Sequence, residues 1–325
     1  MNKKKMKKVT IGIDIGGTGT KFGLVDMEGN VLFHDKIETG LYREFDEYMD
    51  ALSSKIKSSM EEKMVEYDLI GIGVGAPNGN YFTGTVSYAP NLPWKGVLPI
   101  ADTLTEKFGV PTVVSNDANA AAVGEQVFGG AKGMKDFIMV TLGTGLGSGF
   151  VSNGQLIIGD DALAGEMGHI SVKYGRGRSC KCGKKGCLET YVSATGINRT
   201  IFKLLVDSHE DSEFRGVSFN ELTTKEISAA ADRGDPIAIE AFKYTGKILG
   251  VKLADMVTIF NPEAIFLFGG LSLAGDHIFL PTKKYMEKNL MKIYKDKVKI
   301  LPSELGSQGA PIIGAASLVW DKVKS

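Results

Sequence analysis

The sequence predicts an α/β protein made of two related halves that face one another across a cleft. Short apolar strands alternate with helical segments along the chain, a pattern typical of this class. A strand that runs into a glycine-rich turn occurs near the N-terminus and again after Gly129 and Gly130, which indicates that one unit is repeated. The length of 325 residues and the hydrophobic content of 43% fit about two domains with large buried cores.

The first half begins with strands joined by turns. Residues 9–15 alternate between apolar and other side chains and run into a glycine-rich turn, as expected for a strand and its exit. Periodicity and turn residues predict the segments that follow. They are strands at 22–26 and 31–37 around a turn at 28–30, a helix at 45–66, a strand at 69–76 that stops at Pro77, a strand at 113–115, and a helix at 118–126 that Asn116 and Asp117 open.

The second half restarts this pattern. A strand at 137–142 enters a glycine-rich turn at 143–149, and another strand at 264–268 enters Gly269 and Gly270. The remaining prominent segments have helical periodicity. They are 225–232, 237–260 and 312–319. No low-complexity linker separates the halves, so we expect a short hinge.

The bulk composition excludes several classes of partner. The 38 basic and 38 acidic residues balance, so no global field attracts nucleic acid or an anionic membrane. No apolar run is long enough to span a bilayer, and the apolar stretch after the basic residues 1–8 is too short for a signal peptide. We interpret residues 1–8 as a solvated tail, with nucleic-acid binding as the minor alternative. Cysteine usage argues against a secreted disulfide scaffold, so we expect a cytoplasmic protein.

All three cysteines fall in one short window with a histidine and two acids, a spacing that fits a zinc site. The candidate ligands are His169, Cys180, Cys182 and Cys187. The intervening glycines allow the tight knuckle that such a site needs. A shell closed by four protein ligands leaves no position for water, so the zinc would be structural and would fix Glu166, His169 and Glu189 around a polar pocket. The alternative is three reduced thiols without a metal.

Three strand ends finish in glycine, and such turns present backbone N–H groups that can cradle phosphate. For any single turn, a tight turn without a ligand is an equal alternative. The first turn also carries Asp14 before its glycines and Lys21 after them. A carboxylate beside a phosphate requires a cation between them, so Asp14 is a candidate to hold Mg²⁺ through water. The alternative is a turn aspartate bonded to local N–H groups.

Two familiar nucleotide motifs are excluded. Residues 16–21 lack the Gly-Lys-Ser/Thr ending of a P-loop. Residues 71–76 fit Gly-x-Gly-x-x-Ala, but no acidic residue stands about twenty positions further on to hold a ribose. We therefore do not expect a dinucleotide enzyme.

Asn116 and Asp117 lie where a strand hands over to a helix, the place at which open α/β folds expose reactive groups. A helix N-terminus favours an ionised carboxylate, so we expect Asp117 to be charged at neutral pH. It could then accept a proton from a sugar hydroxyl, or orient that hydroxyl, during phosphoryl transfer. An equal alternative is that Asp117 only caps the helix.

Together these motifs resemble the ROK family of sugar kinases and repressors, within the actin-like ATPase superfamily, over nearly the whole chain. The matching segments are Asp14-Ile15-Gly16-Gly17-Thr18, Leu142-Gly143-Thr144-Gly145, Glu166-Met167-Gly168-His169, the knuckle from Cys180 to Glu189, and Gly269-Gly270-Leu271-Ser272. The glycine turns are shared across the superfamily, whereas the Glu-x-Gly-His motif with the cysteines is specific to the family.

The resemblance implies two ribonuclease-H-like lobes with ATP and sugar in the cleft. It assigns residues 1–126 to a small α/β lobe, on which the C-terminal helix 310–325 packs back. Residues 127–309 form the large α/β lobe, with the zinc knuckle at 169–187.

The family's ligand contacts fall on defined positions of this sequence. The implied sugar-binding residues are Asn78, Gly79, Asn116, Asp117, Glu166, His169 and Glu189, with Asp117 as the catalytic base. The implied ATP-binding residues are Asp14, Gly16, Gly17, Thr18, Lys21, Gly143, Thr144 and Gly145 at the phosphates, and Gly269 and Gly270 at the adenosine. By the same resemblance, His169 touches zinc with one ring nitrogen and a sugar hydroxyl with the other.

The activity that the resemblance implies is that of an ATP- and Mg²⁺-dependent hexokinase with structural Zn²⁺. Residues 189–196 are similar to the glucokinase branch, so we expect phosphorylation of glucose to glucose 6-phosphate. Residues 76–80 depart from the family's Pro-Gly-x-Val-Asp run beside the sugar, which leaves N-acetylglucosamine, N-acetylmannosamine, mannose and fructose as alternatives. Polyphosphate in place of ATP also stays open.

A non-catalytic, sugar-sensing regulator is the alternative from another class. The family's repressors carry a helix-turn-helix before the first strand, and here eight residues precede Val9. We therefore expect no DNA recognition by that route. The resemblance also implies a homodimer.

Overall fold

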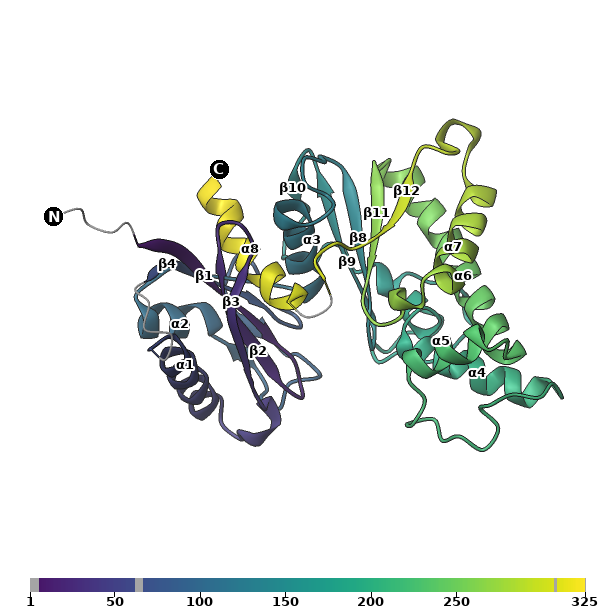
Figure 1. Cartoon of the computed structure of the whole chain (residues 1–325), viewed down its shortest axis with the longest axis horizontal. Helices are drawn as coiled ribbons and strands as arrows, with labels where there is room; N and C mark the ends of the chain where they lie inside the picture. Colours follow the sequence, from purple (N-terminus) through teal and green to yellow (C-terminus); the bar gives the residue numbers. More distant parts are fainter. Residues whose placement is uncertain (1–5, 62–66, 307–308, 325) are drawn as a thin grey trace. The chain divides into compact units, whose positions relative to one another are not determined.

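The computed structural model describes residues 6–61, 67–306 and 309–324, which belong to two compact units (Figure 1). The first unit contains the residues up to Met134, Gln155–Ala164 and those from Glu304 onwards. The second contains Lys135–Gly154 and Gly165–Ser303. Among the described residues, no helix combines the length and the apolar composition that a membrane span requires.

The sheet of the first unit has the strand order β3-β2-β1-β4-β7. Its strands are β1 (Lys7–Ile15), β2 (Thr20–Asp26), β3 (Val31–Ile37), β4 (Tyr67–Gly75) and β7 (Thr112–Ser115), and a separate small pair is β5 (Val86–Ser87) with β6 (Val97–Leu98). β2 is antiparallel to β1 and β3, whereas β1, β4 and β7 are parallel to one another. The carboxyl ends of β1, β4 and β7 therefore meet at one edge of the sheet.

Helices cover both faces of this sheet. They are η1 (Thr39–Leu41), α1 (Phe45–Glu61), α2 (Ile100–Phe108), α3 (Asp117–Phe128) and α8 (Ala310–Lys324). Ile11 and Ile13 of β1 are fully buried in one cluster with Leu52 of α1 and Leu104 of α2. Because side chains alternate along a strand, this leaves the opposite face of β1 to α8, which packs across β1 and β4.

A row of glycines underlies α8. Gly23, Gly12 and Gly73 are in register across β2, β1 and β4. A Cβ at Gly12 would overlap the backbone carbonyl of Ile312, and a Cβ at Gly73 would overlap that of Ala315. α8 thus lies directly on the strand backbone, an approach that only glycine permits.

The second sheet has the order β10-β9-β8-β11-β12 and repeats the arrangement around β1. Its strands are β8 (Phe137–Leu142), β9 (Leu146–Ser152), β10 (Gln155–Leu156), β11 (Ala264–Phe268) and β12 (Lys299–Pro302). β8 is antiparallel to β9 and parallel to β11, as β1 is antiparallel to β2 and parallel to β4. Two equivalent hairpins with glycine turns are the result.

The helices of the second unit lie around α6, whose Leu249 and Leu253 are buried with Val140 of β8 and Ile265 of β11. The helical segments are η2 (Met167–His169), η3 (Leu188–Thr190), α4 (Ala194–Asp207), α5 (Thr224–Asp232), α6 (Pro236–Phe260), η4 (Ser272–Ala274), α7 (Asp276–Asn289) and η5 (Lys292–Tyr294). Both η2 and η3 carry candidate site residues.

The structure confirms the α/β class and the predicted elements, apart from residues 62–66, which lie outside the described residues. Two interpretations are wrong. Lys7 and Lys8 belong to β1 and not to a frayed tail, because they pair with Tyr67 and Asp68 of β4, and Lys7 Nζ also pairs with the buried carboxylate of Asp26 at 2.7 Å. Residues 1–5 of the predicted tail lie outside the described residues. The turn predicted at 143–149 spans only the three residues before Leu146, because β9 pairs with β8 from that residue onwards.

Candidate functional site

The first glycine turn joins β1 to β2 and carries a charged residue on either side. Asp14 and Lys21 are directly opposite one another in the antiparallel pair. Within the turn, the Gly16 N–H donates to Gly19 O at 3.1 Å, and a Cβ at Gly17 would overlap a neighbouring backbone carbonyl. The turn is therefore held in one conformation between an acid and a base, an arrangement compatible with the predicted magnesium and phosphate contacts.

The sheet edge brings a second acid close to this turn. Asp14, Gly75 and Ser115 are in register at the carboxyl ends of β1, β4 and β7. The chain continues from Ser115 into Asn116, whose Oδ1 accepts the Ala118 N–H at 2.8 Å and caps α3. Asp117, the first residue of α3, lies close enough to Asp14 for their charges to interact.

Both carboxyl groups have a raised pKa. Burial, and then the charge of Asp117, raise the pKa of Asp14 to about 6, while Lys21 opposes the shift. Desolvation by the surrounding protein raises the pKa of Asp117, and the Ala118 N–H opposes it. The pKa of Asp117 is therefore shifted upward, whereas a helix N-terminus alone would lower it. Asp117 is exposed to solvent, which limits the rise. A carboxylate with a raised pKa is a better proton acceptor.

Asn78 and Gly79 follow β4 at the same edge. Asn78 has a left-handed backbone, with φ of 54°, and its Nδ2 donates to Ser87 O at 3.1 Å. A Cβ at Gly79 would overlap Ser115 O, so this loop is fixed against the end of β7. Both residues thus belong to the group of polar loops around Asp117.

The second glycine turn joins β8 to β9, and the start of α4 orients it. Gly143 O accepts the Ala194 N–H at 2.9 Å, and Thr144 O accepts from Thr195 Oγ1 at 3.0 Å. In a trans peptide the N–H points away from the preceding C=O. The N–H groups of Thr144 and Gly145 are therefore both directed away from α4, as a phosphate cradle requires.

The third glycine turn follows β11, the parallel neighbour of β8. Gly269 has a φ of 102°, and a Cβ there would crowd the backbone of Leu142. The Leu271 N–H donates to Leu142 O at 3.2 Å, which binds this turn to the end of β8. A Cβ at Gly270 would lie 3.3 Å from Thr224 Oγ1 at the start of α5. The predicted phosphate and adenosine segments of the second unit are thus adjacent.

The four predicted zinc ligands come together in the second unit. The ligand atoms of His169, Cys180, Cys182 and Cys187 all lie within 4.8 Å of one another. Cys180 Sγ lies 3.6 Å from His169 Nδ1, and Cys182 Sγ lies 3.6 Å from Cys187 Sγ. Two thiolates bound tetrahedrally to zinc at about 2.3 Å would be roughly 3.8 Å apart, so this cluster fits the ion.

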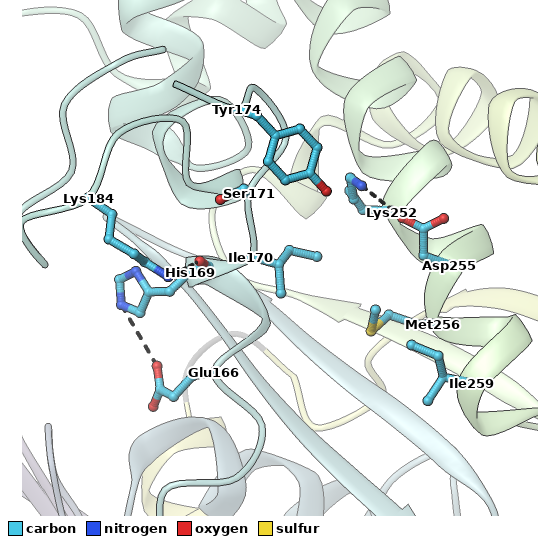
Figure 2. A pocket seen from close by; sticks show the side chains of 10 residues that line it. All are labelled: Glu166, His169, Ile170, Ser171, Tyr174, Lys184, Lys252, Asp255, Met256 and Ile259. Atoms are coloured by element: carbon cyan, nitrogen blue, oxygen red, sulfur yellow. Dashed lines mark hydrogen bonds and ion pairs between the residues drawn. The ribbon is translucent and has the colours of Figure 1, made fainter. Parts of the chain in front are cut away.

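The orientation of His169 divides the roles of its two ring nitrogens. Nδ1 faces the cysteines, while Nε2 lies 3.8 Å from Glu166 Oε2 (Figure 2). Lys184 Nζ donates to His169 O at 2.7 Å and fixes the backbone. Glu166 and His169 also line an open pocket of about 680 Å³ that extends to Lys252 and Asp255 of α6. The histidine thus presents one nitrogen to the cluster and the other to a solvent-accessible carboxylate.

Glu189 links the cysteine cluster to the second glycine turn. Its Oε1 lies 3.5 Å from Cys180 Sγ, and its Oε2 accepts the Leu146 N–H at 3.1 Å. A Cβ at Gly145 would overlap Glu189 Oε2. The glycine at this position is therefore required for the approach of the carboxylate as well as for the turn.

The structure separates the predicted site residues into two groups, each gathered within one unit. The first unit holds Asp14, Gly16, Gly17, Thr18, Lys21, Asn78, Gly79, Asn116 and Asp117. The second unit holds Gly143, Thr144, Gly145, Glu166, His169, Cys180, Cys182, Cys187, Glu189, Gly269 and Gly270. The sequence analysis missed Lys184, Ser193 and Arg178, which support these residues. A signal was present only at Ser193, which precedes α4 and caps it by accepting the Gly196 N–H.

The paired glycine-turn hairpins and the Cys3His cluster define a class of protein. The family model described as the ROK family matches residues 10–322, and the chain belongs to that family. Its fold is accordingly that of the ROK glucokinases, with two ribonuclease-H-like halves of the actin-like ATPase superfamily.

Individual relatives include enzymes and regulators. The chain is 36% identical to a glucokinase from Halalkalibacterium halodurans, with 97% of this chain and 96% of that protein covered. A crystal structure of a ROK family glucokinase from Streptomyces griseus, in complex with glucose and AMPPNP, has a TM-score of 0.80 at 34% identity and covers 96% of this chain and 99% of that one. The xylose repressor of Bacillus subtilis is 29% identical, with 96% of this chain and 77% of the repressor covered.

Proposed function

We propose that this protein is an ATP- and Mg²⁺-dependent hexokinase that converts glucose to glucose 6-phosphate. The observation that carries the proposal is the arrangement around His169, whose Nδ1 faces three cysteines and whose Nε2 faces Glu166, with Glu189 bonded to the glycine turn beside it. The side chains that accept hydrogen bonds from sugar hydroxyls and the backbone N–H groups that bind phosphate are thus held together in one rigid arrangement. The similarity to glucokinases over nearly the whole chain supports the same activity.

The hexose is held by fixed polar groups. Several hydroxyls need several acceptors, and a buried acceptor left unpaired makes a wrong sugar costly to bind. We assign this role to Asn78, Gly79, Asn116, Asp117, Glu166, His169 and Glu189. Asp117 is the catalytic base, because its raised pKa and its place beside Asp14 suit a group that accepts or orients the proton of the attacking hydroxyl.

The nucleotide contacts come from the glycine turns. Thr144 and Gly145 donate N–H groups to the phosphates, and Gly269 and Gly270 contact the adenosine. The first unit also binds the phosphates, through Gly16, Gly17, Thr18 and Lys21. Asp14 holds Mg²⁺ through water, because a bound cation favours the ionised form of a carboxyl group that burial otherwise keeps partly protonated.

We assign structural Zn²⁺ to His169, Cys180, Cys182 and Cys187. A zinc ion would fix the ring of His169 and the approach of Glu189 to Cys180, and four protein ligands leave it no catalytic position. We also propose that residues 1–126 with 310–325 form the small lobe of the kinase and residues 127–309 the large lobe. A homodimer in the cytoplasm completes the proposal.

A sugar-sensing regulator is the second candidate, because repressors are among the relatives. One experiment separates the two. ADP release is measured with Mg²⁺ and ATP across glucose, mannose, fructose, N-acetylglucosamine and N-acetylmannosamine. Formation of the sugar phosphate is measured with polyphosphate in place of ATP, and zinc is measured in the same preparation. We expect the highest kcat/KM with glucose and one zinc per chain. Glucose binding by calorimetry without any turnover would favour the regulator.

A further inference from the structure

We infer that Arg178 is a positioning residue that holds Glu189 and the glycine turn at 143–145 in one fixed arrangement. The inference rests on the proposed function, since it concerns how the hexose and phosphate contacts of the second unit are kept together. Arg178 belongs to the loop before Cys180 and is partly buried.

The guanidinium of Arg178 connects two segments. Nη1 donates to Thr190 O at 2.9 Å and to Gly196 O at 2.8 Å, and Nη2 donates to Thr200 Oγ1 at 3.0 Å. The same group lies 4.6 Å from the ring centre of Tyr191, a buried side chain whose hydroxyl accepts the Arg178 N–H. Among the described residues Arg178 forms no salt bridge, so its hydrogen bonds serve backbone geometry and not charge pairing.

The first of these segments, η3, contains Glu189, the acid assigned to the hexose site. Thr190 follows Glu189 in η3, so the bond to Thr190 O fixes the peptide next to the acid. From there Glu189 reaches across to the Leu146 N–H at the end of the glycine turn. A rotation of η3 would therefore move the carboxylate away from the turn.

The second segment is the start of α4, which orients the glycine turn. Gly196 lies in the first turn of α4, and Ala194 and Thr195 just before it bond the two carbonyls that direct the N–H groups of the turn. Thr200 lies one turn further along the same helix. One guanidinium thus fixes both the start of α4 and η3, and each of them contacts the same three-residue turn.

The chemistry of arginine suits this position. The planar guanidinium presents donors in a rigid fork and stacks on an aromatic ring, so it can satisfy acceptors on two segments at once. A lysine has one ammonium on a flexible stem and cannot reproduce the stacked, forked geometry. The conservative exchange is therefore a sensitive probe of positioning.

Arg199 provides a matched control. Its Nη1 donates to Ser179 O at 3.1 Å, so it also bonds the loop before Cys180 from α4. Its side-chain hydrogen bond among the described residues goes to this loop and not to η3 or the glycine turn. A role limited to bracing the loop predicts similar effects at Arg178 and Arg199, whereas positioning predicts an effect at Arg178 alone.

The test compares Arg178→Lys, Arg178→Ala and Arg199→Ala in the full chain with zinc content verified. We expect the KM values for both glucose and ATP to rise about tenfold in Arg178→Ala, as a loss of roughly 1.4 kcal/mol in each site would give. Arg178→Lys should show a smaller rise, and Arg199→Ala should stay within about twofold. A merely structural role lowers the fraction of active protein, which reduces kcat and leaves both KM values unchanged.

Calorimetric titration with glucose and with AMPPNP gives the same comparison without turnover. Weaker binding of both ligands to the Arg178 variants supports the inference, and wild-type affinities in those variants overturn it. If Arg178→Ala loses zinc or fails to fold, Arg178→Lys decides the question by the same criterion. A wild-type protein that binds glucose but releases no ADP contradicts the proposed kinase activity and leaves the comparison of affinities intact. A wild type that binds neither ligand contradicts both.

Discussion

The two glycine-turn hairpins have the same topology but differ in whether charged side chains flank the turn. Ile15 and Thr20 close the first turn, and Leu142 and Leu146 close the second. The next pair outward is Asp14 opposite Lys21 in the first hairpin and Thr141 opposite Gly147 in the second. The first turn has charged side chains beside it, and the second has backbone groups that other segments orient. The repeat of one fold has thus produced one turn flanked by the charges of Asp14 and Lys21 and one turn that receives the carboxylate of Glu189 from outside its hairpin.

This contrast also explains what supports each turn. Asp14 is in register with the strand ends that lead to Asp117, so the sheet itself sets the distance between the acids. The turn at 143–145 depends instead on Glu189 and the start of α4, which are remote in sequence. Both turns should be sensitive to added volume, because a Cβ at Gly17 or at Gly145 would overlap a neighbouring atom. The first turn should also be sensitive to changes of charge at Asp14 and Lys21.

The largest expected effect is that of Asp117→Asn. Asparagine keeps the size and the first-turn position but cannot accept the proton, so kcat should fall by about 100- to 10,000-fold while glucose affinity stays within a few-fold. Steady-state kinetics and calorimetry measure the two quantities. Asp102→Asn, an exposed acid in the first turn of α2, is the matched control and should be neutral. Near-normal turnover of Asp117→Asn would remove the assigned role.

A smaller effect should separate two glycines of the second turn. A Cβ at Gly145 would overlap Glu189 Oε2, while a Cβ at Gly143 meets nothing within 4 Å. Gly145→Ala should therefore displace the carboxylate and raise the KM for glucose by about tenfold. Gly143→Ala should leave this KM nearly unchanged. Equal KM values in the two variants would contradict the link between Glu189 and the turn.

The third expected effect is on stability and not on activity, at Asp14. Its pKa is about 6 in the folded protein against an ordinary value of 3.8, so the folded state binds more protons than the unfolded state between these values. Wild-type stability should accordingly fall as the pH rises from about 4 to 6, by at most roughly 3 kcal/mol.

Asp14→Asn removes the unfavourable free energy of ionising a carboxyl group in this partly buried position. Urea unfolding without Mg²⁺ should show the variant to be more stable than the wild type at pH 7.5, with the difference vanishing near pH 4. In the wild type, the KM for Mg·ATP should rise as the pH falls below 6, because a protonated Asp14 no longer attracts the cation. Parallel stability curves for the wild type and Asp14→Asn would show that the charge of Asp14 carries no such cost.

Local patterns made most of the fold predictable. The strand at 137–142 and the helix at 237–260 have clear periodicity, and the structure has them as β8 and α6 with shifts of one residue or less at their ends. Lys7 was misjudged because its partner Asp26 lies on another strand, so no local pattern distinguishes it from a solvated tail. Residues 146–149 were misjudged because glycine signals a turn locally, whereas their strand conformation comes from pairing with β8, in which Gly147 is opposite Thr141 and Gly149 opposite Met139.

The candidate site was predictable where chemistry is concentrated in sequence. Cys180, Cys182 and Cys187 form a compact motif with one purpose, and the structure brings them to His169 as predicted. Arg178 could not be found in this way, because its importance arises from carbonyl groups of Thr190 and Gly196 that have no sequence signature. Side chains that bind ligands can form recognisable sequence motifs, as the cysteines do here. Side chains that bond backbone carbonyls, such as Arg178, form no such motif.

The glycine row under α8 has a consequence for how the chain folds as it leaves the ribosome. β1 is among the first segments made, but one of its faces is covered only when α8 emerges at the far end of the chain. Gly165–Ser303 forms one uninterrupted stretch of the second unit, and all of it is made before α8. Contacts of such long sequence separation form slowly. The face of β1 and β4 that α8 covers must therefore stay exposed until the end of synthesis, and nascent-chain chaperones should bind that face.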